Sequence, residues 1–401
     1  MDPNIARLHP YPFEKLTKLK FGITPPADKS PIALSIGEPK HRAPAFVLET
    51  LENTLGSITN YPITKGLDTL REAISQWATQ RFQLSPNSLS AAEHILPVNG
   101  TREALFAFTQ ALFDRTKAGK KIIMPNPFYQ IYEGAALLAG AEPHFLACSQ
   151  ENNYAPDFHA VTDDIWQQCQ LLFICSPGNP TGNVLSLETL QHLITLADKH
   201  DFVIASDECY SELYFNEDAP PPGLLQACAN MQRDDYHRCV VFHSLSKRSN
   251  LPGLRSGFIA GDKTLIQPFL KYRTYHGCAM PVFSQHASIA AWQDEVHVQE
   301  NRALYREKFA AVLKELNGCL DVDMPDAGFY LWPRTGMGDE AFAQSLFASE
   351  NITVLPGSYL GREDSGLNPG AGHVRMALVA PLDECIDAAQ RIKHFIENLS
   401  A

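Results

Sequence analysis

Polar and ionisable residues stand directly after several short apolar segments of this chain. One such segment is followed by Ser244-Leu245-Ser246-Lys247, with Arg255 eight residues beyond the lysine. Other apolar segments are followed by runs that contain Gly100-Thr101-Arg102, Tyr129, Asn179, Asp207 and Tyr210. If these segments are parallel strands, their carboxyl ends share one edge of a sheet, which is where open α/β sheets bind ligands. That edge would combine an anion-binding helix start with an aromatic ring, an amide, a carboxylate, a phenol, a lysine and an arginine.

Together these groups match the chemical requirements of pyridoxal phosphate. Its aldehyde needs a lysine amine for a Schiff base. Its pyridine nitrogen needs a carboxylate partner, so that the ring stays protonated and accepts electrons. Its phosphate favours backbone N–H groups at a helix start, hydroxyls and an arginine, and its ring face favours an aromatic side chain. The sequence therefore predicts a pyridoxal-phosphate site and no metal site.

The same motifs resemble those of class I pyridoxal-phosphate aminotransferases of fold type I, along essentially the whole chain and in the right order. The motifs are Ser244-Leu245-Ser246-Lys247 with Arg255, Asn179-Pro180-Thr181-Gly182, Asp207-Glu208-Cys209-Tyr210, Tyr61 with Gly66, Asn99-Gly100-Thr101-Arg102-Glu103 and His373-Val374-Arg375-Met376. The resemblance implies amino-group transfer from a small-molecule donor to a 2-oxo acid. It also implies an α/β fold, with a mostly parallel mixed sheet in a large domain and a smaller α/β domain from the N- and C-terminal segments.

The resemblance also implies roles for the residues around the cofactor ring. Lys247 would form the Schiff base, and Asp207 would pair with the pyridinium. Asn179 and Tyr210 would hydrogen-bond the ring oxygen, and Tyr129 would stack on the ring. Lys247, Asp207 and Tyr210 would thus form the catalytic group.

Further implied roles concern the phosphate and the substrate. The phosphate would be held by Gly100, Thr101, Arg102, Ser244, Ser246 and Arg255. Arg102 would act through its backbone N–H, because the usual residue of the family differs there. Arg375 would bind the substrate α-carboxylate, with Gly37 and Asn179 close by. Tyr61 would reach the phosphate of the neighbouring subunit, which requires a homodimer with shared active sites.

The spacing of apolar residues predicts the elements that carry these groups. Strands are expected at 94–98, 121–124, 171–175, 202–206, 239–243 and 256–260, with helices such as 102–113 and 187–200 between them. Ser186 is a candidate N-cap for the second helix. The connection before 256–260 is short for a parallel crossover, so this strand is expected to be antiparallel. The pattern is typical of a doubly wound α/β layer.

Changes in composition and in the spacing of apolar residues along the chain predict three segments. A proline-rich arm with a short strand at 32–36 covers 1–45, and the cofactor-binding domain covers 46–287. Near residue 287 the pattern changes to one long charged helix that reaches about residue 316, and a final helix covers 382–399. The C-terminal domain would then be 288–401, with the N-terminal arm packed on it.

Charge and composition exclude several classes of protein. The formal net charge is −12, whereas a nucleic-acid-binding protein should have a basic surface. No apolar run approaches the roughly 20 residues of a membrane span, and the N-terminus has no signal-peptide pattern. The nine cysteines include no C-x-x-C pair, which favours reduced thiols in a cytoplasmic protein over disulfides or zinc.

Four segments resemble one branch of the family more closely, the enzymes that act on N-succinyl-LL-2,6-diaminopimelate with 2-oxoglutarate in lysine and diaminopimelate biosynthesis. They are 8–16, 37–41, 272–281 and 367–372. This donor carries carboxylates besides the one at its reacting carbon, so further cations should line the site. The candidates are Lys40, Arg42 and Arg273, and the hydroxyls of Tyr11 and Tyr275 are the neutral alternative.

Other interpretations remain open from the sequence. An aminotransferase for aspartate, aromatic or acetylornithine-type donors would share every cofactor residue, and so would a carbon–sulfur lyase of the same fold. A ligand-sensing module of a transcription regulator would need a DNA-binding segment, and the arm here is short and not basic. Gly370-Ala371-Gly372 lacks the lysine and the strand–helix context of a phosphate loop. Among the histidines, only His41 and His276 neighbour site segments.

Overall fold

The computed structural model describes residues 1–364 and 366–399. Over these residues the strands form one seven-stranded sheet and two small sheets. The large sheet has the order β2 (Ile95–Val98), β8 (Gly257–Gly261), β7 (Cys239–Ser244), β6 (Val203–Asp207), β5 (Cys169–Cys175), β3 (Lys121–Asn126) and β4 (Glu142–Ala147). β8 is antiparallel to both of its neighbours, as the short connection predicted, and the other paired strands are parallel.

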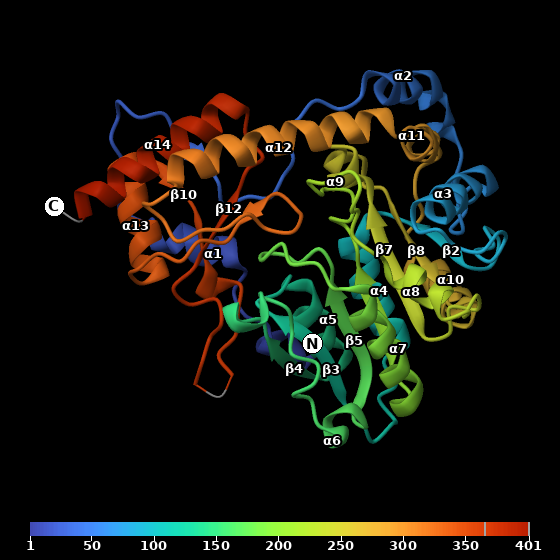
Figure 1. Ribbon diagram of the computed structural model, residues 1–401. Helices are drawn as coiled ribbons and strands as arrows, with labels where there is room; N and C mark the ends of the chain where they lie inside the picture. The colour runs from blue at the N-terminus through green and yellow to red at the C-terminus, as the bar shows by residue number, and fades with distance from the viewer. Residues whose placement is uncertain (365, 400–401) are drawn as a thin grey trace.

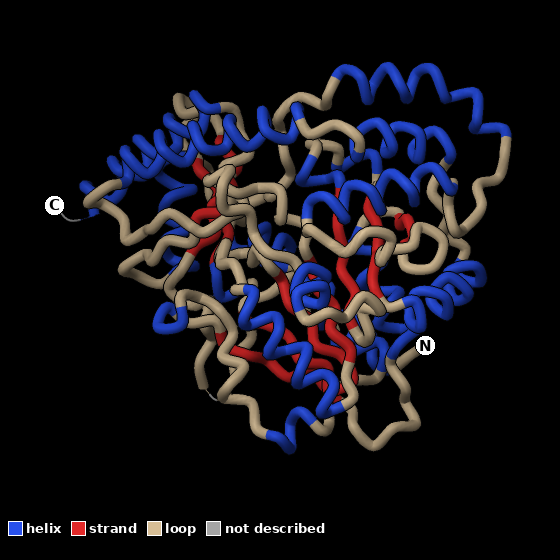
Figure 2. Tube along the Cα trace, turned by 45° about the vertical axis from the view of Figure 1, so that its right-hand side comes forward, coloured by secondary structure: helices blue, strands red, loops and turns tan. Residues whose placement is uncertain are grey.

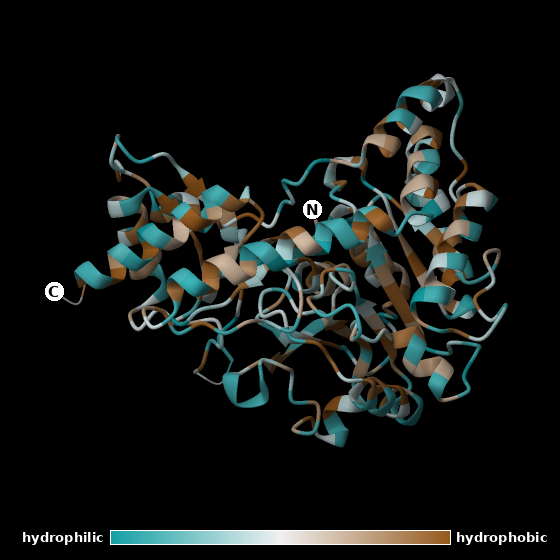
Figure 3. Ribbon diagram, turned by 45° about the horizontal axis from the view of Figure 1, so that its top comes forward, coloured by the Kyte–Doolittle hydropathy of each residue, from teal (hydrophilic) through white to brown (hydrophobic). Residues whose placement is uncertain are grey.

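Helices cover both faces of this sheet because its strands are apolar on both sides. Ile123, Leu172 and Ile204 belong to the cluster on one face, and Ile122, Leu171 and Val203 belong to the cluster on the other. The first face is covered by α3 (Asp68–Arg81), α7 (Leu187–His200), α8 (Leu224–Asn230) and α11 (Val282–Trp292), and the second by α4 (Thr101–Leu112), α5 (Ile131–Ala139) and α10 (Lys263–His276). Figure 2 shows the strands in the interior, and Figure 3 shows their hydrophobic colour against the mixed colours of the helices.

Most elements fall where the sequence placed them, and two expectations were wrong in detail. α7 has the expected bounds, and Ser186 accepts a hydrogen bond from the Thr189 N–H as its N-cap. The edge strand β4 was missed. The long helix expected from residue 287 is two helices, α11 and α12 (Val296–Leu316), because Asp294 accepts the His297 N–H and starts a new helix there.

A third hydrophobic cluster joins the N- and C-terminal segments. β1 (Ile32–Ala33), shorter than the expected strand, pairs in parallel with β10 (Ile352–Thr353). β11 (Leu355–Pro356), β12 (Val374–Ala377) and β9 (Tyr330–Leu331) form an antiparallel sheet beside them. The helices around these sheets are α1 (Pro12–Leu19), α12, α13 (Asp339–Glu350) and α14 (Leu382–Leu399). The N-terminal arm therefore packs on the C-terminal segment, as the fold class implied.

α12 connects the two parts of the molecule. In Figure 1 it runs from beside α14 to α11, above the edge of the large sheet. Arg302 on α12 donates two hydrogen bonds to Glu217, which lies in the loop after β6. The remaining helices are α2 (Ala45–Thr54), which packs on α11, and the short α6 (Asp163–Trp166) and α9 (Leu245–Arg248). The domain boundaries at 45 and 287 stay predictions.

Among residues 1–364 and 366–399, every helix is too short or too polar to cross a bilayer.

Candidate active site

A cavity of about 470 Å³ lies at the carboxyl ends of the large sheet and extends to the C-terminal segment. All residues assigned to the site from the sequence line it except Tyr61 and Gly100. Those that line it are Gly37, Thr101, Arg102, Tyr129, Asn179, Asp207, Tyr210, Ser244, Ser246, Lys247, Arg255 and Arg375. The edge predicted from strand order is therefore the place where these side chains meet.

Lys247 extends into the cavity from the short helix α9, directly after β7. The Ser244 side chain accepts a hydrogen bond from the Ser246 N–H at 3.1 Å and so caps this helix. Lys247 Nζ donates to the Gly37 carbonyl at 2.6 Å. Burial lowers the pKa of Lys247 to about 8. Its amine is therefore neutral far more often near physiological pH than that of an ordinary lysine, and a nucleophile or a base requires the neutral form.

Asp207 is the last residue of β6 and is buried beneath the cavity. Its carboxylate accepts hydrogen bonds from the Tyr132 hydroxyl at 2.7 Å and from the Cys209 N–H at 3.2 Å. Burial raises the pKa of Asp207. Within the described chain no ion pair joins this carboxylate to a cation. A protonated pyridine nitrogen would supply that cation, so the site fits the cofactor at this end.

The start of α4 and Arg255 form a cradle for an anion. Gly100 precedes α4 with φ +84°, and a Cβ there would lie 2.2 Å from Arg255 Nη2. The guanidinium therefore rests against the backbone where the first N–H groups of the helix are free. Thr101, the first residue of α4, and Ser246 also line the cavity here. This arrangement suits a phosphate group.

Arg102 differs from the expectation that only its backbone acts. Its side chain lines the cavity, and its Nε donates to the Tyr129 hydroxyl at 2.5 Å. Its Nη2 lies 3.4 Å from the Tyr11 hydroxyl. These contacts hold the exposed guanidinium at one wall of the cavity. The N-terminal segment supplies Tyr11 to the same wall.

Arg375 enters the cavity from β12. Its Nη1 donates to Asn179 Oδ1 at 3.0 Å, and its Nη2 donates to the Ser35 carbonyl at 2.9 Å. Its guanidinium lies 4.5 Å from the centre of the Tyr330 ring. Its Nε is buried without a partner in the described structure. Such a partly satisfied, oriented guanidinium suits a planar carboxylate ligand.

Two tyrosines support this part of the site, and one was missed from the sequence. The hydroxyls of Tyr210 and Tyr330 lie 3.1 Å apart, and burial raises the pKa of Tyr210. Tyr330 stands on a strand of two residues, too short to give a pattern. Tyr132 was missed as well, although its place three residues after Tyr129, on one face of a helix start, was a usable signal.

The cations expected to bind the distal carboxylates do not line the cavity in this chain. Lys40 faces Glu384 at 4.0 Å, and Arg42 is exposed outside the cavity. Arg273 is completely buried, with Nη1 at 2.5 Å from Glu103 Oε1. In a single chain none of the three candidates lines the cavity, and Lys40 and Arg273 are each next to a carboxylate.

The other residues that the sequence analysis named as candidates lie outside the cavity. The Tyr61 side chain is fully exposed, and so is most of Tyr275. His41 bonds Asn301 and Lys308 at 2.7 Å and 2.6 Å, which is a structural role. The Gly372 N–H donates to Asp339, and the glycine-rich run near it lies in a turn before β12.

The cavity is locally cationic although the chain is acidic. Its charged lining residues are Arg102, Lys247, Arg255 and Arg375 against Glu38 and Asp207. Four cations against two carboxylates favour an anionic ligand with more than one charged group.

Comparison with known proteins defines the class of this chain. The family model described as "Aminotransferase class I and II" matches residues 29–392, and the chain belongs to that family. An aminotransferase from Neisseria meningitidis has a solved structure that is 46% identical, with a TM-score of 0.93 over 98% of this chain and 99% of that one. Aminotransferase AspB from Helicobacter pylori is 38% identical, with a TM-score of 0.89 over 98% and 99%.

More distant relatives carry more specific names. The LL-diaminopimelate aminotransferase of Maridesulfovibrio salexigens is 29% identical over 97% of both chains. A structure named probable N-succinyldiaminopimelate aminotransferase, from Thermus thermophilus, is 25% identical, with a TM-score of 0.83 over 96% of this chain and 100% of that one. This chain is thus a pyridoxal-phosphate-dependent aminotransferase, and the predicted fold type, enzyme class and cofactor are confirmed.

Proposed function

We propose that this aminotransferase transfers the amino group of N-succinyl-LL-2,6-diaminopimelate to 2-oxoglutarate, in lysine and diaminopimelate biosynthesis. The observation that carries the proposal is the pair of cavity arginines, Arg375 and Arg102, which come from different parts of the fold. A donor with a carboxylate at each end would find one arginine as the partner of each carboxylate. The names of the diaminopimelate-specific relatives support the same carbon skeleton.

The proposed roles of the residues follow from their contacts. Bound pyridoxal phosphate supplies the aldehyde that takes up the amino group and a ring that accepts electrons. Asp207 keeps the ring nitrogen protonated, and Tyr132 holds the Asp207 carboxylate in place. Arg255 and the start of α4 bind the phosphate. Tyr129 would pack on the ring, and Asn179 and Tyr210 would bind the ring oxygen.

Lys247 is the proposed base of the reaction. Its neutral amine would take the proton that the donor α-carbon loses. Its low pKa, caused by burial, favours the neutral form that this step needs. Arg375 fixes the α-carboxylate as a bidentate partner and so orients the α C–H bond toward the amine.

Arg102 is the proposed partner of a distal carboxylate. Of the cations that line the cavity in the described chain, Lys247, Arg255 and Arg375 already have roles in the mechanism. The side chain of Arg102 is held by Tyr129 and Tyr11, so it is oriented before substrate binds. The hydroxyl of Tyr11 can donate to the same carboxylate.

LL-diaminopimelate itself is the second candidate donor, because several curated relatives bear that name. The two donors differ in charge. At neutral pH the free diamino acid has two ammonium and two carboxylate groups, whereas the succinylated donor has three carboxylates and one ammonium group. The excess of cations in the cavity favours the more anionic donor.

A donor screen tests this proposal. Glutamate formation from 2-oxoglutarate would be measured with N-succinyl-LL-diaminopimelate, LL-diaminopimelate, acetylornithine, aspartate and phenylalanine. We expect the highest kcat/KM with the succinylated donor. A higher value with any other donor contradicts the proposal, and release of pyruvate from cystathionine without an acceptor would identify a lyase.

We also propose a homodimer in which Tyr61 reaches the cofactor phosphate of the partner subunit. Tyr61 is fully exposed in the single chain, and the nearby Ile58 and Ile63 expose 73% and 56% of their surface. Exposed apolar side chains grouped in this way are typical of protein–protein interfaces. A cytoplasmic location is part of the same proposal.

A further inference from the structure

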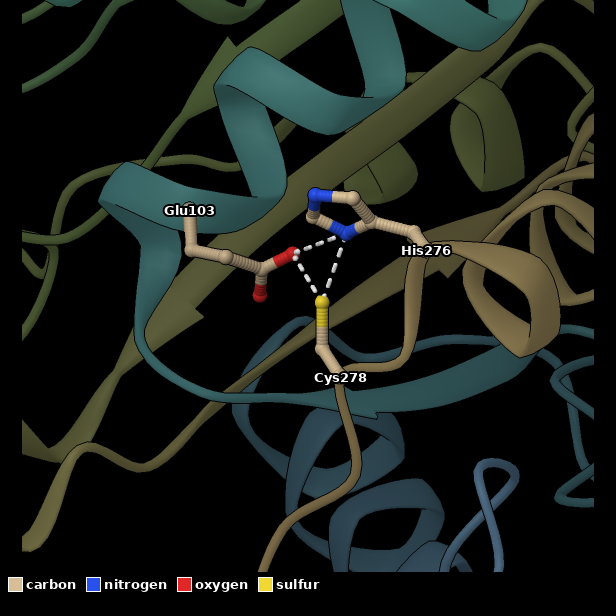
Figure 4. A group of neighbouring side chains, drawn as sticks. All are labelled: Glu103, His276 and Cys278. Carbon is tan, nitrogen blue, oxygen red and sulfur yellow. Dashed lines mark hydrogen bonds and ion pairs between the residues drawn. The ribbon is translucent and has the colours of Figure 1, made fainter.

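Three side chains with different metal-binding atoms meet outside the active-site cavity. Glu103 lies in the first turn of α4, His276 is the last residue of α10, and Cys278 follows in the loop before α11. Figure 4 shows all three pointing toward one another. Cys278 Sγ lies 2.7 Å from His276 Nδ1 and 3.2 Å from Glu103 Oε1. The distance between His276 Nδ1 and Glu103 Oε1 is 4.0 Å.

This triangle of atoms is close to the size that a zinc ion requires. With usual Zn–S, Zn–N and Zn–O lengths, a tetrahedral site separates its ligand atoms by roughly 3.4–3.6 Å. The short contact between sulfur and nitrogen is the one that a bound ion would lengthen. His276 is 39% exposed and precedes Gly277, which has φ +88°, so this end of the helix has room to adjust.

The ligand types also fit. Imidazole, thiolate and carboxylate are all usual zinc ligands, and the mixture of soft sulfur with harder nitrogen and oxygen suits a borderline ion. A Zn²⁺ ion with one thiolate and one carboxylate is neutral overall. Zinc binds the thiolate form of cysteine, so binding would release the Cys278 proton to solvent as the Zn–S bond forms.

Arg273 is the charged group that faces Glu103 from α10. Its buried guanidinium donates to Glu103 Oε1, the oxygen nearest to the thiol. A carboxylate has about four lone-pair sites, so it accepts this hydrogen bond and binds a cation at once. Glu103 Oε2 is buried without a hydrogen-bond partner. Arg273 therefore orients the carboxylate, as outer partners of metal ligands commonly do.

We propose that Glu103, His276 and Cys278 bind one Zn²⁺ ion, with water as the fourth ligand. The ion would join the loop before α11 to the first turn of α4, next to Gly100 and Thr101. The sequence predicted no metal site because its cysteines form no C-x-x-C pair. The structure brings together ligands from two segments about 170 residues apart in sequence.

Calorimetric titration of the holoenzyme with ZnCl₂ tests the proposal. We expect one ion per chain and the release of one proton, seen as a dependence of the heat on the ionisation enthalpy of the buffer. Losing an outer partner of a metal ligand costs roughly 10–100-fold in affinity. Losing a direct ligand through His276→Gln or Cys278→Ser should therefore weaken binding by more than about 100-fold, and Cys278→Ser should also abolish the proton release.

Cys319→Ser provides the matched control, because Cys319 is another partly exposed free cysteine and bonds only the Leu316 carbonyl. It should leave zinc binding unchanged. Glu103→Gln is avoided, since it removes the carboxylate partner of the buried Arg273. Two outcomes would overturn the proposal. One is zinc binding that keeps its affinity in both His276→Gln and Cys278→Ser, and the other is wild-type binding as weak as that of these variants.

Discussion

The hydroxyl of Tyr132 donates a hydrogen bond of 2.7 Å to Asp207 Oδ2 beneath the active-site cavity. Both side chains are buried, and the Tyr132 ring also stacks on Phe173 with centroids 4.7 Å apart. The packing against Phe173 thus holds the phenol in place beside the carboxylate. This bond lowers the pKa of Asp207, whereas burial raises it by more.

Tyr132→Phe should shift the pH dependence of catalysis while keeping the ring packing. Without the hydroxyl, the pKa of Asp207 rises further, so its carboxylate is lost at a higher pH as the pH falls. The acid limb of the kcat/KM profile should therefore move upward in pH. A hydrogen bond to a charged group is worth roughly 1.5–3 kcal/mol, so kcat should fall about 10–150-fold near neutral pH. Tyr129→Phe is the control, because that phenol bonds Arg102 instead. An unshifted acid limb would contradict the role of Tyr132.

Capture of pyridoxal phosphate by the apoenzyme should depend on the protonation of Lys247. Its pKa of about 8 means that the neutral, reactive amine increases as the pH rises through 8. The rate of Schiff-base formation, followed by visible absorbance, should rise through that pH and then level off. Borohydride should fix the cofactor on Lys247. Lys308 is the other lysine whose pKa burial lowers to about 8, and an adduct there would refute the assignment.

Arg375→Lys should weaken every substrate together, because each carries an α-carboxylate. Lysine keeps the charge but loses the two parallel hydrogen bonds of the guanidinium. We expect kcat/KM to fall roughly 10–150-fold for the donor and for glutamate alike. Both half-reactions would be measured by stopped-flow absorbance. A loss limited to one substrate would argue against an α-carboxylate partner.

Arg102→Gln should act on the donor selectively. The succinylated donor brings a carboxylate much farther from the reacting carbon than the γ-carboxylate of glutamate, so the ratio of kcat/KM for succinyldiaminopimelate to that for glutamate should fall about 10-fold or more. Arg102→Lys should restore part of the ratio. A ratio that stays within about threefold of the wild type in both variants would leave neutral donors, such as Tyr11, to bind the succinyl group.

Complementation in mixed dimers tests Tyr61. If Tyr61 serves the partner subunit, Tyr61→Phe and Lys247→Ala chains should each be impaired alone. A mixed dimer of the two should regain one active site that carries neither change. Recovered activity in the mixture, together with a dimer in analytical ultracentrifugation, supports the shared site. A fully active monomer contradicts it.

Much of the fold was predictable because an apolar strand followed by polar residues is a pattern that a short stretch of sequence contains in full. β4 was not, since Glu142–Ala147 is an edge strand with partly exposed residues and Pro143, and it lacks the apolar run of the central strands. The break between α11 and α12 contains no glycine or proline. The His297 N–H in the first turn of α12 donates to Asp294 Oδ1, and such a local contact leaves no mark in the spacing of apolar residues.

The site was predictable where a motif follows a strand, and less so where distant segments meet. Lys247 and Asp207 stand at strand ends, so their positions followed from the order of strands. The Lys247–Gly37 hydrogen bond joins residues 210 positions apart, and the Arg375–Ser35 bond spans 340. The direction of the Arg273 side chain could not be inferred, because its partner Glu103 is 170 residues away in sequence and lies on another helix.

The contact between Gly37 and Tyr330 has an evolutionary consequence. A Cβ at position 37 would lie 2.0 Å from the Tyr330 hydroxyl oxygen, and 2.8 Å and 2.9 Å from two of its ring carbons. Tyr330→Phe would remove the first clash but not the other two, so even alanine at 37 would need a smaller residue at 330. Each position therefore restricts the amino acids that the other can accept. Among the descendants of a common ancestor, we expect a side chain at 37 only where the aromatic ring at 330 has already been lost.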